Sequence, residues 1–364
     1  MKKLYRYIFL SLFSVNALVL LACIILYALI DALMIAGDLV KDMQGIILLL
    51  QYILVRVPFY IYQMAPLVIL VGSAIALMRF VRNYEYVVMR VNGISLFRMA
   101  LLMWLFAMMM GGVSFAIGEY LLMPSAKLSQ QMLVRTKTNK VSLLGKHNVW
   151  VKSKGEIVEL WQVLPDYSLK NVLRYQLDED NELKNIKYSL RGVYLGHNTW
   201  RLEGISNIHF SPRMIEKNTH SEEIWHPDFN MDLLSVLLSK PTDLSIKNLH
   251  SYINYLKRNQ QKVIDYELTL WKKFFYPFAL GVMVLIALVF TPLISRYSNE
   301  GLKLVLSILV GVTYFFFLRF FSFFTDLTFL PPLISAVLPT LIFYIALWVV
   351  LYYQESCLLY TSDA

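Results

Sequence analysis

Six long apolar segments constrain the fold of this chain more than any other feature of its sequence. They cover residues 8–30, 57–78, 97–118, 274–294, 303–324 and 333–353. An α-helix needs about 20 predominantly apolar residues to cross the hydrocarbon core of a bilayer, and each segment is near that length. Only 16% of the residues are charged, against about 25% in an average soluble domain. The sequence therefore predicts a membrane α-helical bundle of six transmembrane helices.

The first apolar segment has some features of a secretory signal. It follows the basic stretch MKKLYRY, and LLAC at 20–23 is similar to a lipoprotein cleavage site. However, the apolar run continues well beyond Cys23, whereas the apolar core of a cleaved signal spans about 7–15 residues and ends in polar sequence. We therefore expect a retained transmembrane helix.

Positive charge in the short loops predicts the orientation of the chain, because Lys and Arg are enriched in cytoplasmic loops. One set of loops carries Lys2, Lys3, Arg6, Arg79, Arg82, Arg90, Arg98, Arg296 and Lys303. The opposite short loops, 31–56 and 325–332, carry only Lys41 and Arg56. We expect both termini and segment 79–95 in the cytoplasm, and the region between the third and fourth spans on the other side of the membrane.

The region between the third and fourth spans has the alternation that is typical of β-strands. Alternating stretches occur at 147–163, 171–177, 183–195 and 199–210. Residues 123–245 are therefore predicted to form an inserted antiparallel β domain, either a sandwich or a β-jellyroll. Helical spacing of apolar residues then indicates that 246–355 comprises a connecting helix and the last three spans. We assign no role to the tail 356–364.

The loop RFVRNYEYVVMRVNGIS, at 79–95, is too apolar for a simple connection between spans. On a helical projection its apolar residues fall within an arc of about 120°. These residues are Phe80, Val81, Tyr84, Val87, Val88 and Val91. We predict an amphipathic helix over 79–93 within a first unit, residues 1–122, that also contains three spans. Gly93 is the expected helix stop, and Ser95 is the expected cap of the third span.

Two interpretations of the 79–93 helix remain open. It lies flat on the membrane with its arginines at anionic lipid, or it docks in a groove on a cytoplasmic partner. Glu85 borders the apolar face, and an acid at that position gives a lipid-facing helix no advantage.

Polar residues near the outer ends of the spans also have two interpretations. Arg319, within FFFLRFFSFF, either snorkels to the interface or faces an anionic ligand. Asp31 and Glu119 either mark the water boundary or, together with Asp326, form the active site of a membrane-embedded lipid-modifying enzyme. No pair of these acids has a spacing that is diagnostic of such a site. Pro277 and the small residues of the third span, including Gly111, are interpreted as helix packing.

Motifs for chemistry or energy conversion are missing from the sequence. It contains no GxxxxGK[ST] motif, no CxxC pair and no HxxxH or HExxH pair. We therefore expect no metal site and no cofactor. If the chain is a transporter, a partner must supply the energy. A scaffold that anchors an envelope complex is a further alternative.

Four stretches carry a resemblance to a known family. They are EYVVMRVNG at 85–93, FAIGEY at 115–120 followed by Pro124, the helical block 249–288, and PPLISAVLP at 331–339. Over nearly its whole length the chain resembles the lipopolysaccharide export permease family LptF/LptG, and it is more similar to LptG than to LptF. An LptF-type paralogue of the same complex is the alternative.

The resemblance implies a permease subunit of an ABC-type lipopolysaccharide exporter in the bacterial inner membrane. Expected partners are an LptF-like permease, an LptB-like ATPase dimer that uses the ATP, and LptC-like and LptA-like periplasmic proteins, with no nucleic acid. By the same resemblance, the β domain is expected to be a periplasmic jellyroll, and the first and fifth spans are expected to form lateral gates. The 79–93 segment is expected to be the coupling helix, with ATPase-docking residues Tyr84, Glu85, Val88, Met89, Arg90 and Gly93. The matching positions Glu119, Pro124 and Pro277 are structural candidates.

One departure from the family affects the expected lipid site. The resemblance implies lysines on and after the first span that meet lipid A phosphates, but ALIDALMIAGD, at 28–38, contains none. The substrate-binding candidates are therefore Lys41, Arg56, Arg135 and Arg319.

Overall fold

The computed structural model describes most of the chain. The described residues are 2–39, 42–136, 149–153, 156–163, 168–177, 183–210, 215–227, 241–259, 261–290, 300–328 and 330–360. The helices are α1 (Lys2–Leu39), α2 (Met43–Arg82), α3 (Glu85–Val91), α4 (Leu96–Tyr120), α5 (Leu122–Thr136), η1 (Pro241–Asp243), α7 (Ile246–Arg258), α8 (Ile264–Phe290), α9 (Glu300–Thr328) and α10 (Pro332–Tyr360). Within the described residues, six helices (α1, α2, α4, α8, α9 and α10) are long and apolar enough to cross a membrane, which confirms the six predicted spans.

The first two membrane helices are longer than the sequence predicts. Residues 31–56 were expected to form a loop, but α2 begins at Met43 and has 40 residues. At about 1.5 Å per residue it is about 60 Å long, twice the roughly 30 Å hydrocarbon core. The extension packs against α1, where Arg56 of α2 lies 3.2 Å from Asp31 of α1. This helix pair therefore extends beyond the membrane.

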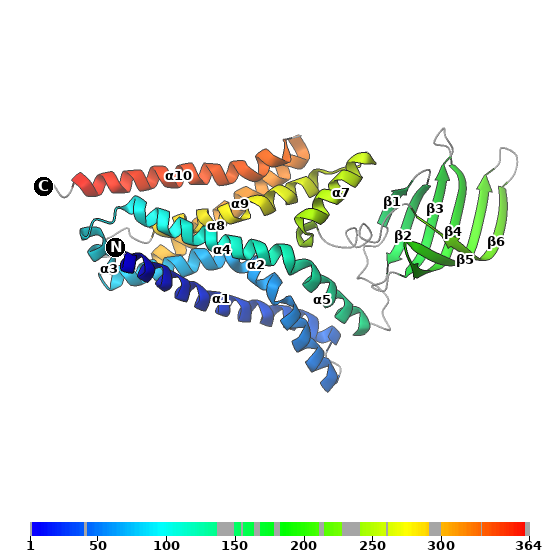
Figure 1. Ribbon diagram of the computed structural model, residues 1–364, viewed down its shortest axis with the longest axis horizontal. Coiled ribbons are helices and arrows are strands. Elements are labelled where there is room, and N and C mark those ends of the chain that lie inside the picture. The colour runs from blue at the N-terminus through cyan, green and yellow to red at the C-terminus, as the bar shows by residue number, and fades with distance from the viewer. Residues whose placement is uncertain are drawn as a thin grey trace.

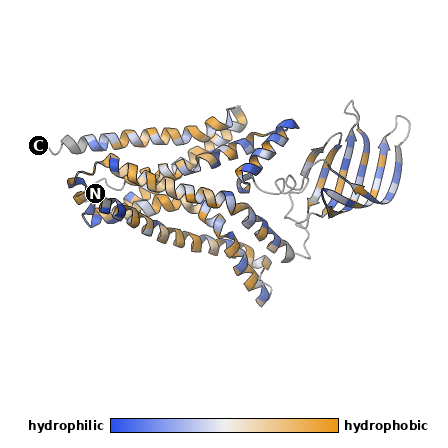
Figure 2. Cartoon of the chain, viewed as in Figure 1, coloured by the Kyte–Doolittle hydropathy of each residue, from blue (hydrophilic) through white to orange (hydrophobic). Residues whose placement is uncertain are grey.

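The core of the bundle is built around α8, which packs against α2, α4, α9 and α10 (Figure 1). All residues from Leu280 to Val289 are buried. A helix that is apolar on all sides suits either lipid or a packed core, and this part of α8 lies in the core. Orange colouring along the bundle in Figure 2 shows how far the apolar character extends.

A six-stranded antiparallel sheet is inserted between α5 and η1, as the alternation predicts. Its strands are β1 (Val149–Ser153), β2 (Glu156–Val163), β3 (Leu169–Leu177), β4 (Leu183–Gly196), β5 (Thr199–Phe210) and β6 (Ile215–Trp225). Each described strand pairs with its sequence neighbours, so these strands form a meander. One face is buried around Trp200, Leu202 and Val158, as expected for a sheet that covers a core.

Two features of this region differ from the predicted pattern. The β domain was expected to begin at residue 123, but 122–136 is helix α5, which packs against α2. Strand β6 was not predicted, because its sequence IEKNTHSEEIW is mostly polar and lacks clear alternation. It forms because β5 supplies hydrogen-bonding partners along almost its whole length, with a gap at Gly204.

Candidate functional site

The short helix α3 lies at the end of the bundle opposite the sheet, beside the N-terminus and the end of α10 (Figure 1). The predicted single helix over 79–93 is broken, because Phe80 is buried in the bundle core and α2 therefore continues to Arg82. The backbone then turns at Tyr84, where φ is 60°, and α3 begins at Glu85. The break makes α3 a separate two-turn element at the surface.

One face of α3 is apolar and exposed. Tyr84, Val87, Val88 and Val91 are exposed by 75%, 46%, 58% and 83%. The opposite face holds Tyr86 and Met89, which are buried in the bundle core. Met89 was predicted to be a docking residue, but it anchors the helix and does not lie on the exposed face. The four exposed residues, called the α3 face below, have the spacing and chemistry of a helix that enters a groove on another protein.

Polar contacts fix α3 to distant parts of the chain. The hydroxyl group of Tyr7, in α1, donates a hydrogen bond to Glu85 at 3.0 Å. Arg90 and Glu355, near the end of α10, form an ion pair at 3.1 Å. The same Glu355 carboxylate accepts a hydrogen bond from the backbone NH of Leu96 at the start of α4. Arg90 and Glu85 are therefore both engaged within the chain, and Glu85 also lies beside the α3 face.

The connection from α3 to α4 is also defined. Gly93 has a φ of 81°, which favours glycine, and its carbonyl oxygen accepts a hydrogen bond from the Arg98 side chain at 3.2 Å. The Ser95 hydroxyl accepts a hydrogen bond from the backbone NH of Arg98, so Ser95 caps α4 as predicted. Both ends of α3 are therefore set by specific backbone geometry.

A second candidate site is a cavity of about 440 Å³ near the opposite end of the bundle. Helices α1, α2, α5 and α9 line it together with η1. Its wall combines aromatic rings, such as Tyr27, with hydroxyl and amide groups, such as Ser129 and Gln130. Arg56 and Arg319 both line this outer cavity, so the fold brings together two of the four predicted substrate-binding residues.

Arg56 is paired inside the chain. Its guanidinium lies 3.2 Å from an oxygen of Asp31, donates a hydrogen bond to the Tyr52 hydroxyl at 2.5 Å and lies 4.6 Å from the ring centroid of Phe59. Tyr60 donates a hydrogen bond to the same Asp31 oxygen at 2.6 Å. Asp31 and Arg56 therefore hold α1 against the extended part of α2.

Arg319 is exposed and forms no ion pair with the described part of the chain, so its charge can meet a ligand. The other two candidates are less defined. Lys41 lies outside the described residues. Arg135 belongs to α5, but its side chain is outside the described set.

Glu119 connects the bundle to the segment that leads from the sheet to α7. Both of its carboxylate oxygens lie 2.9 Å from the backbone nitrogen of Ile246, the first residue of α7. The buried ammonium of Lys273, in α8, donates a hydrogen bond to the carbonyl oxygen of Leu244. These four residues form what we call the outer latch. A carboxylate is favourable here because a helix N-terminus carries partial positive charge.

The two prolines predicted to be structural have different surroundings. Pro124 is exposed in the first turn of α5. Pro277 lies inside α8 against Gly111 of α4, where an added Cβ would come within 2.8 Å of the Pro277 Cα atom. Gly111 and Pro277 therefore allow α4 and α8 to approach closely.

The sheet contains an ion cluster that joins β3, β4 and β6. Arg174, which is buried, lies 2.9 Å from Glu223, and Lys187 lies 3.1 Å from the same carboxylate. Burial acts to raise the pKa of Glu223, but the hydrogen bonds and charges of Arg174 and Lys187 outweigh it and lower the pKa below its ordinary value. The charged form of Glu223 therefore stabilises the folded sheet.

Sequence reasoning did not identify Tyr7, Glu355 or Lys273. Tyr7 lies 78 positions from Glu85, and Glu355 lies 265 positions from Arg90, so no local pattern relates them. The only available signal was a charge at the end of an apolar run. Among the described residues, no group of three His, Cys, Asp or Glu side chains is placed to hold a metal ion.

The residues 6–353 match a family model described as lipopolysaccharide export system permease LptF/LptG. The chain belongs to the LptF/LptG family. It is therefore an inner-membrane permease of lipopolysaccharide export, and its six spans with one inserted sheet agree with that membership.

Individual members of the LptF/LptG family show the same relationship. The chain is 27% identical to the lipopolysaccharide export system permease protein LptG of Escherichia coli strain K12 over 305 residues, which are 82% of this chain and 84% of that protein. It is 26% identical to the protein of the same name from Haemophilus influenzae over 284 residues, which are 78% and 79% of the two chains.

Proposed function

We propose that this permease is the LptG-type subunit of an ABC exporter that extracts lipopolysaccharide from the outer leaflet of the inner membrane. A separate LptB-like ATPase dimer supplies the energy by docking on the α3 face. The observation that carries this mechanism is an exposed apolar helix face whose opposite side is buried in the bundle core. A chain that lacks a P-loop needs such a surface to receive the energy of ATP hydrolysis. No cofactor is assigned to the permease itself.

The position of α3 supports the proposed orientation. It lies at the same end of the bundle as the N-terminus and the end of α10, and the sheet lies beyond the other end (Figure 1). Arg79, Arg82 and Arg98 flank α3, in agreement with a cytoplasmic location. The sheet is then periplasmic, where it transfers lipid to LptC-like and LptA-like proteins.

The outward faces of α1 and α9 support pairing with an LptF-like permease. Only 6% of the residues in the α1 span and 17% of those in the α9 span are buried within the chain, the smallest shares among the described membrane helices. Exposed Phe316, Phe320 and Phe323 lie on α9 near Arg319. A partner that packs on both helices would enclose the outer cavity between two subunits. The Arg319 cation would meet a phosphate of the lipid there by a charge-assisted hydrogen bond.

The proposal is tested with the permease purified together with its ATPase and its second permease. Val88→Asp places a charge in the centre of the α3 face, where docking would bury it, so we expect ATPase co-purification and lipopolysaccharide release from proteoliposomes to be lost. Leu190→Asp is the matched control, because Leu190 is exposed by 60% on β4 and Val88 by 58%. Glu85→Ala is expected to weaken co-purification while membrane insertion is retained.

Two results would contradict the proposal. If Val88→Asp and Leu190→Asp retain the same amount of ATPase, the α3 face is not the docking surface. If the wild-type complex hydrolyses ATP but releases no lipopolysaccharide to a periplasmic acceptor, the transport function itself is wrong.

A further inference from the structure

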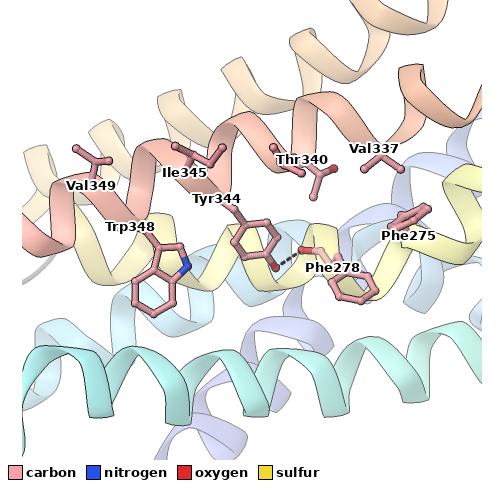
Figure 3. Close-up of a pocket in the computed structure, with 9 residues that line it drawn as sticks. Phe275, Phe278, Val337, Thr340, Tyr344, Ile345, Trp348 and Val349 are labelled. Atoms are coloured by element: carbon pink, nitrogen blue, oxygen red, sulfur yellow. Dashed lines mark hydrogen bonds between the residues drawn. The ribbon is translucent and has the colours of Figure 1, made fainter.

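An apolar groove of about 460 Å³ lies between α8 and α10. Phe275 and Phe278 line it from α8, and Val337, Ile345 and Trp348 are among the residues that line it from α10 (Figure 3). The groove shares no lining residue with the outer cavity or the α3 face. Both of its helices are candidate membrane spans, so the groove lies within the hydrocarbon region.

The polar groups beside the groove are already used by the protein. The Tyr344 hydroxyl donates a hydrogen bond to the Phe278 carbonyl oxygen at 2.8 Å and accepts one from the Trp104 indole at 2.9 Å. Thr340 is hydrogen-bonded to Tyr314 at 3.1 Å. Figure 3 shows the Tyr344 hydroxyl directed to α8. The groove therefore offers carbon surface and suits an apolar ligand segment.

The length of the groove matches one extended hydrocarbon chain. Its lining on α10 extends from Val337 to Val349, and the twelve steps between these residues correspond to about 18 Å along the helix. This is close to one leaflet of a bilayer, about 15 Å.

The outer end of the groove is positively charged. Lys272 precedes Phe275 by one helical turn on α8 and has no ion-pair partner in the described chain. A bound anion would compensate the positive charge of Lys272. Lysine binds phosphate as a point charge at such positions.

We propose that the α8–α10 groove is a binding site for an anionic glycerophospholipid of the surrounding membrane. One acyl chain lies along α10 from Val337 to Val349, and the headgroup phosphate lies at Lys272. The site is separate from the transport path and does not depend on the function proposed above.

The test uses the full complex in nanodiscs that contain phosphatidylglycerol with a photoactivatable diazirine in its acyl chain. We expect crosslinks on α10 between residues 337 and 349. Ile345→Trp fills the groove and is expected to reduce them several-fold, because the indole occupies the space of the acyl chain. Ile342→Trp is the matched control, because Ile342 is an exposed isoleucine of the same helix that does not line the groove. Its crosslink yield is expected to equal that of the wild type.

The headgroup is tested with Lys272→Gln. We expect this variant to lose the preference for phosphatidylglycerol over phosphatidylcholine carrying the same diazirine chain. Equal yields for Ile345→Trp and Ile342→Trp would overturn the acyl site, and an unchanged lipid preference in Lys272→Gln would overturn the headgroup assignment. Displacement by added lipopolysaccharide would place the groove on the transport path, and protection by the second permease would make it a subunit interface. Either result would also overturn the proposal.

Discussion

At the scale of single residues, the contacts distinguish neighbours that look equivalent in the sequence. Gly111 and Gly112 are adjacent in α4, but an added Cβ at Gly111 would meet the Pro277 backbone of α8, whereas nothing lies within 4 Å of one at Gly112. Glycine is otherwise unfavourable in a helix by about 1 kcal/mol relative to alanine. Gly111 is thus retained for close packing, and Gly112 has no such requirement.

This difference gives a prediction for stability. Gly111→Ala is expected to lower the thermal unfolding midpoint, because overpacking costs about 1–3 kcal/mol and exceeds the gain in helix propensity. Gly112→Ala is expected to leave the midpoint unchanged or to raise it slightly. Thermal unfolding of the purified permease in detergent measures both. Equal midpoints for the two variants would show that α4 and α8 can move apart without a loss of stability.

At the scale of elements, α3 is positioned by helices that are distant in sequence. Its core side rests on the bundle through Tyr86 and Met89, and Glu355 of α10 binds both Arg90 and the start of α4. Force applied to the α3 face is therefore transmitted to α4 and α10. The short length of α3 suits this role, since two turns held at both ends cannot bend independently.

The Arg90–Glu355 ion pair is expected to position α3 for docking. Arg90→Glu and Glu355→Arg should each reduce ATPase co-purification several-fold, and the double reversal should recover part of it. The coupling energy of such a contact is about 0.5–3 kcal/mol. Recovery stays partial because an arginine at position 355 cannot accept the hydrogen bond from Leu96.

The control for these charge reversals is Arg201→Glu, which disrupts the more exposed Arg201–Glu203 pair on β5, separated by 3.7 Å. It should leave co-purification unchanged, because exposed ion pairs contribute little. If the two single variants and the double variant show simply additive losses, the ion pair does not position α3.

At the scale of the whole molecule, the outer latch connects the membrane bundle to the segment that leads from the sheet. Glu119 comes from α4 and Lys273 from α8, and both hold backbone groups between η1 and α7. Since α4 also begins at the Glu355 contact, one helix connects the α3 region with the latch. This path connects the α3 end of the bundle with the end that faces the sheet.

Glu119→Ala is expected to uncouple the two ends of the permease. Loss of hydrogen bonds to a charged group costs about 1.5–3 kcal/mol, so amide hydrogen exchange in the first turn of α7 should become at least about tenfold faster. Lipopolysaccharide release should fall while ATPase co-purification is retained. Glu267→Ala is the control, because it breaks the more exposed Lys257–Glu267 pair between α7 and α8. Equal exchange rates in the two variants would exclude the latch.

Local sequence patterns predict much of the fold. The six spans follow from apolar runs of membrane-spanning length, and the limits of β5 follow from an alternating stretch between two turns. The amphipathic character of 84–91 identifies α3 as a surface helix. The extension of α2 and the strand β6 could not be predicted in this way, because contacts with α1 and β5 stabilise them.

What the sequence determined by itself is the membrane class, the inserted sheet and the apolar face of α3, because these depend on the order of polar and apolar residues along short segments. Tertiary structure alone decided that Arg56 is paired with Asp31, that Met89 is buried, and that Glu355 holds Arg90. These contacts join residues that are far apart in the chain. They depend on how whole helices pack, and no short segment encodes that arrangement.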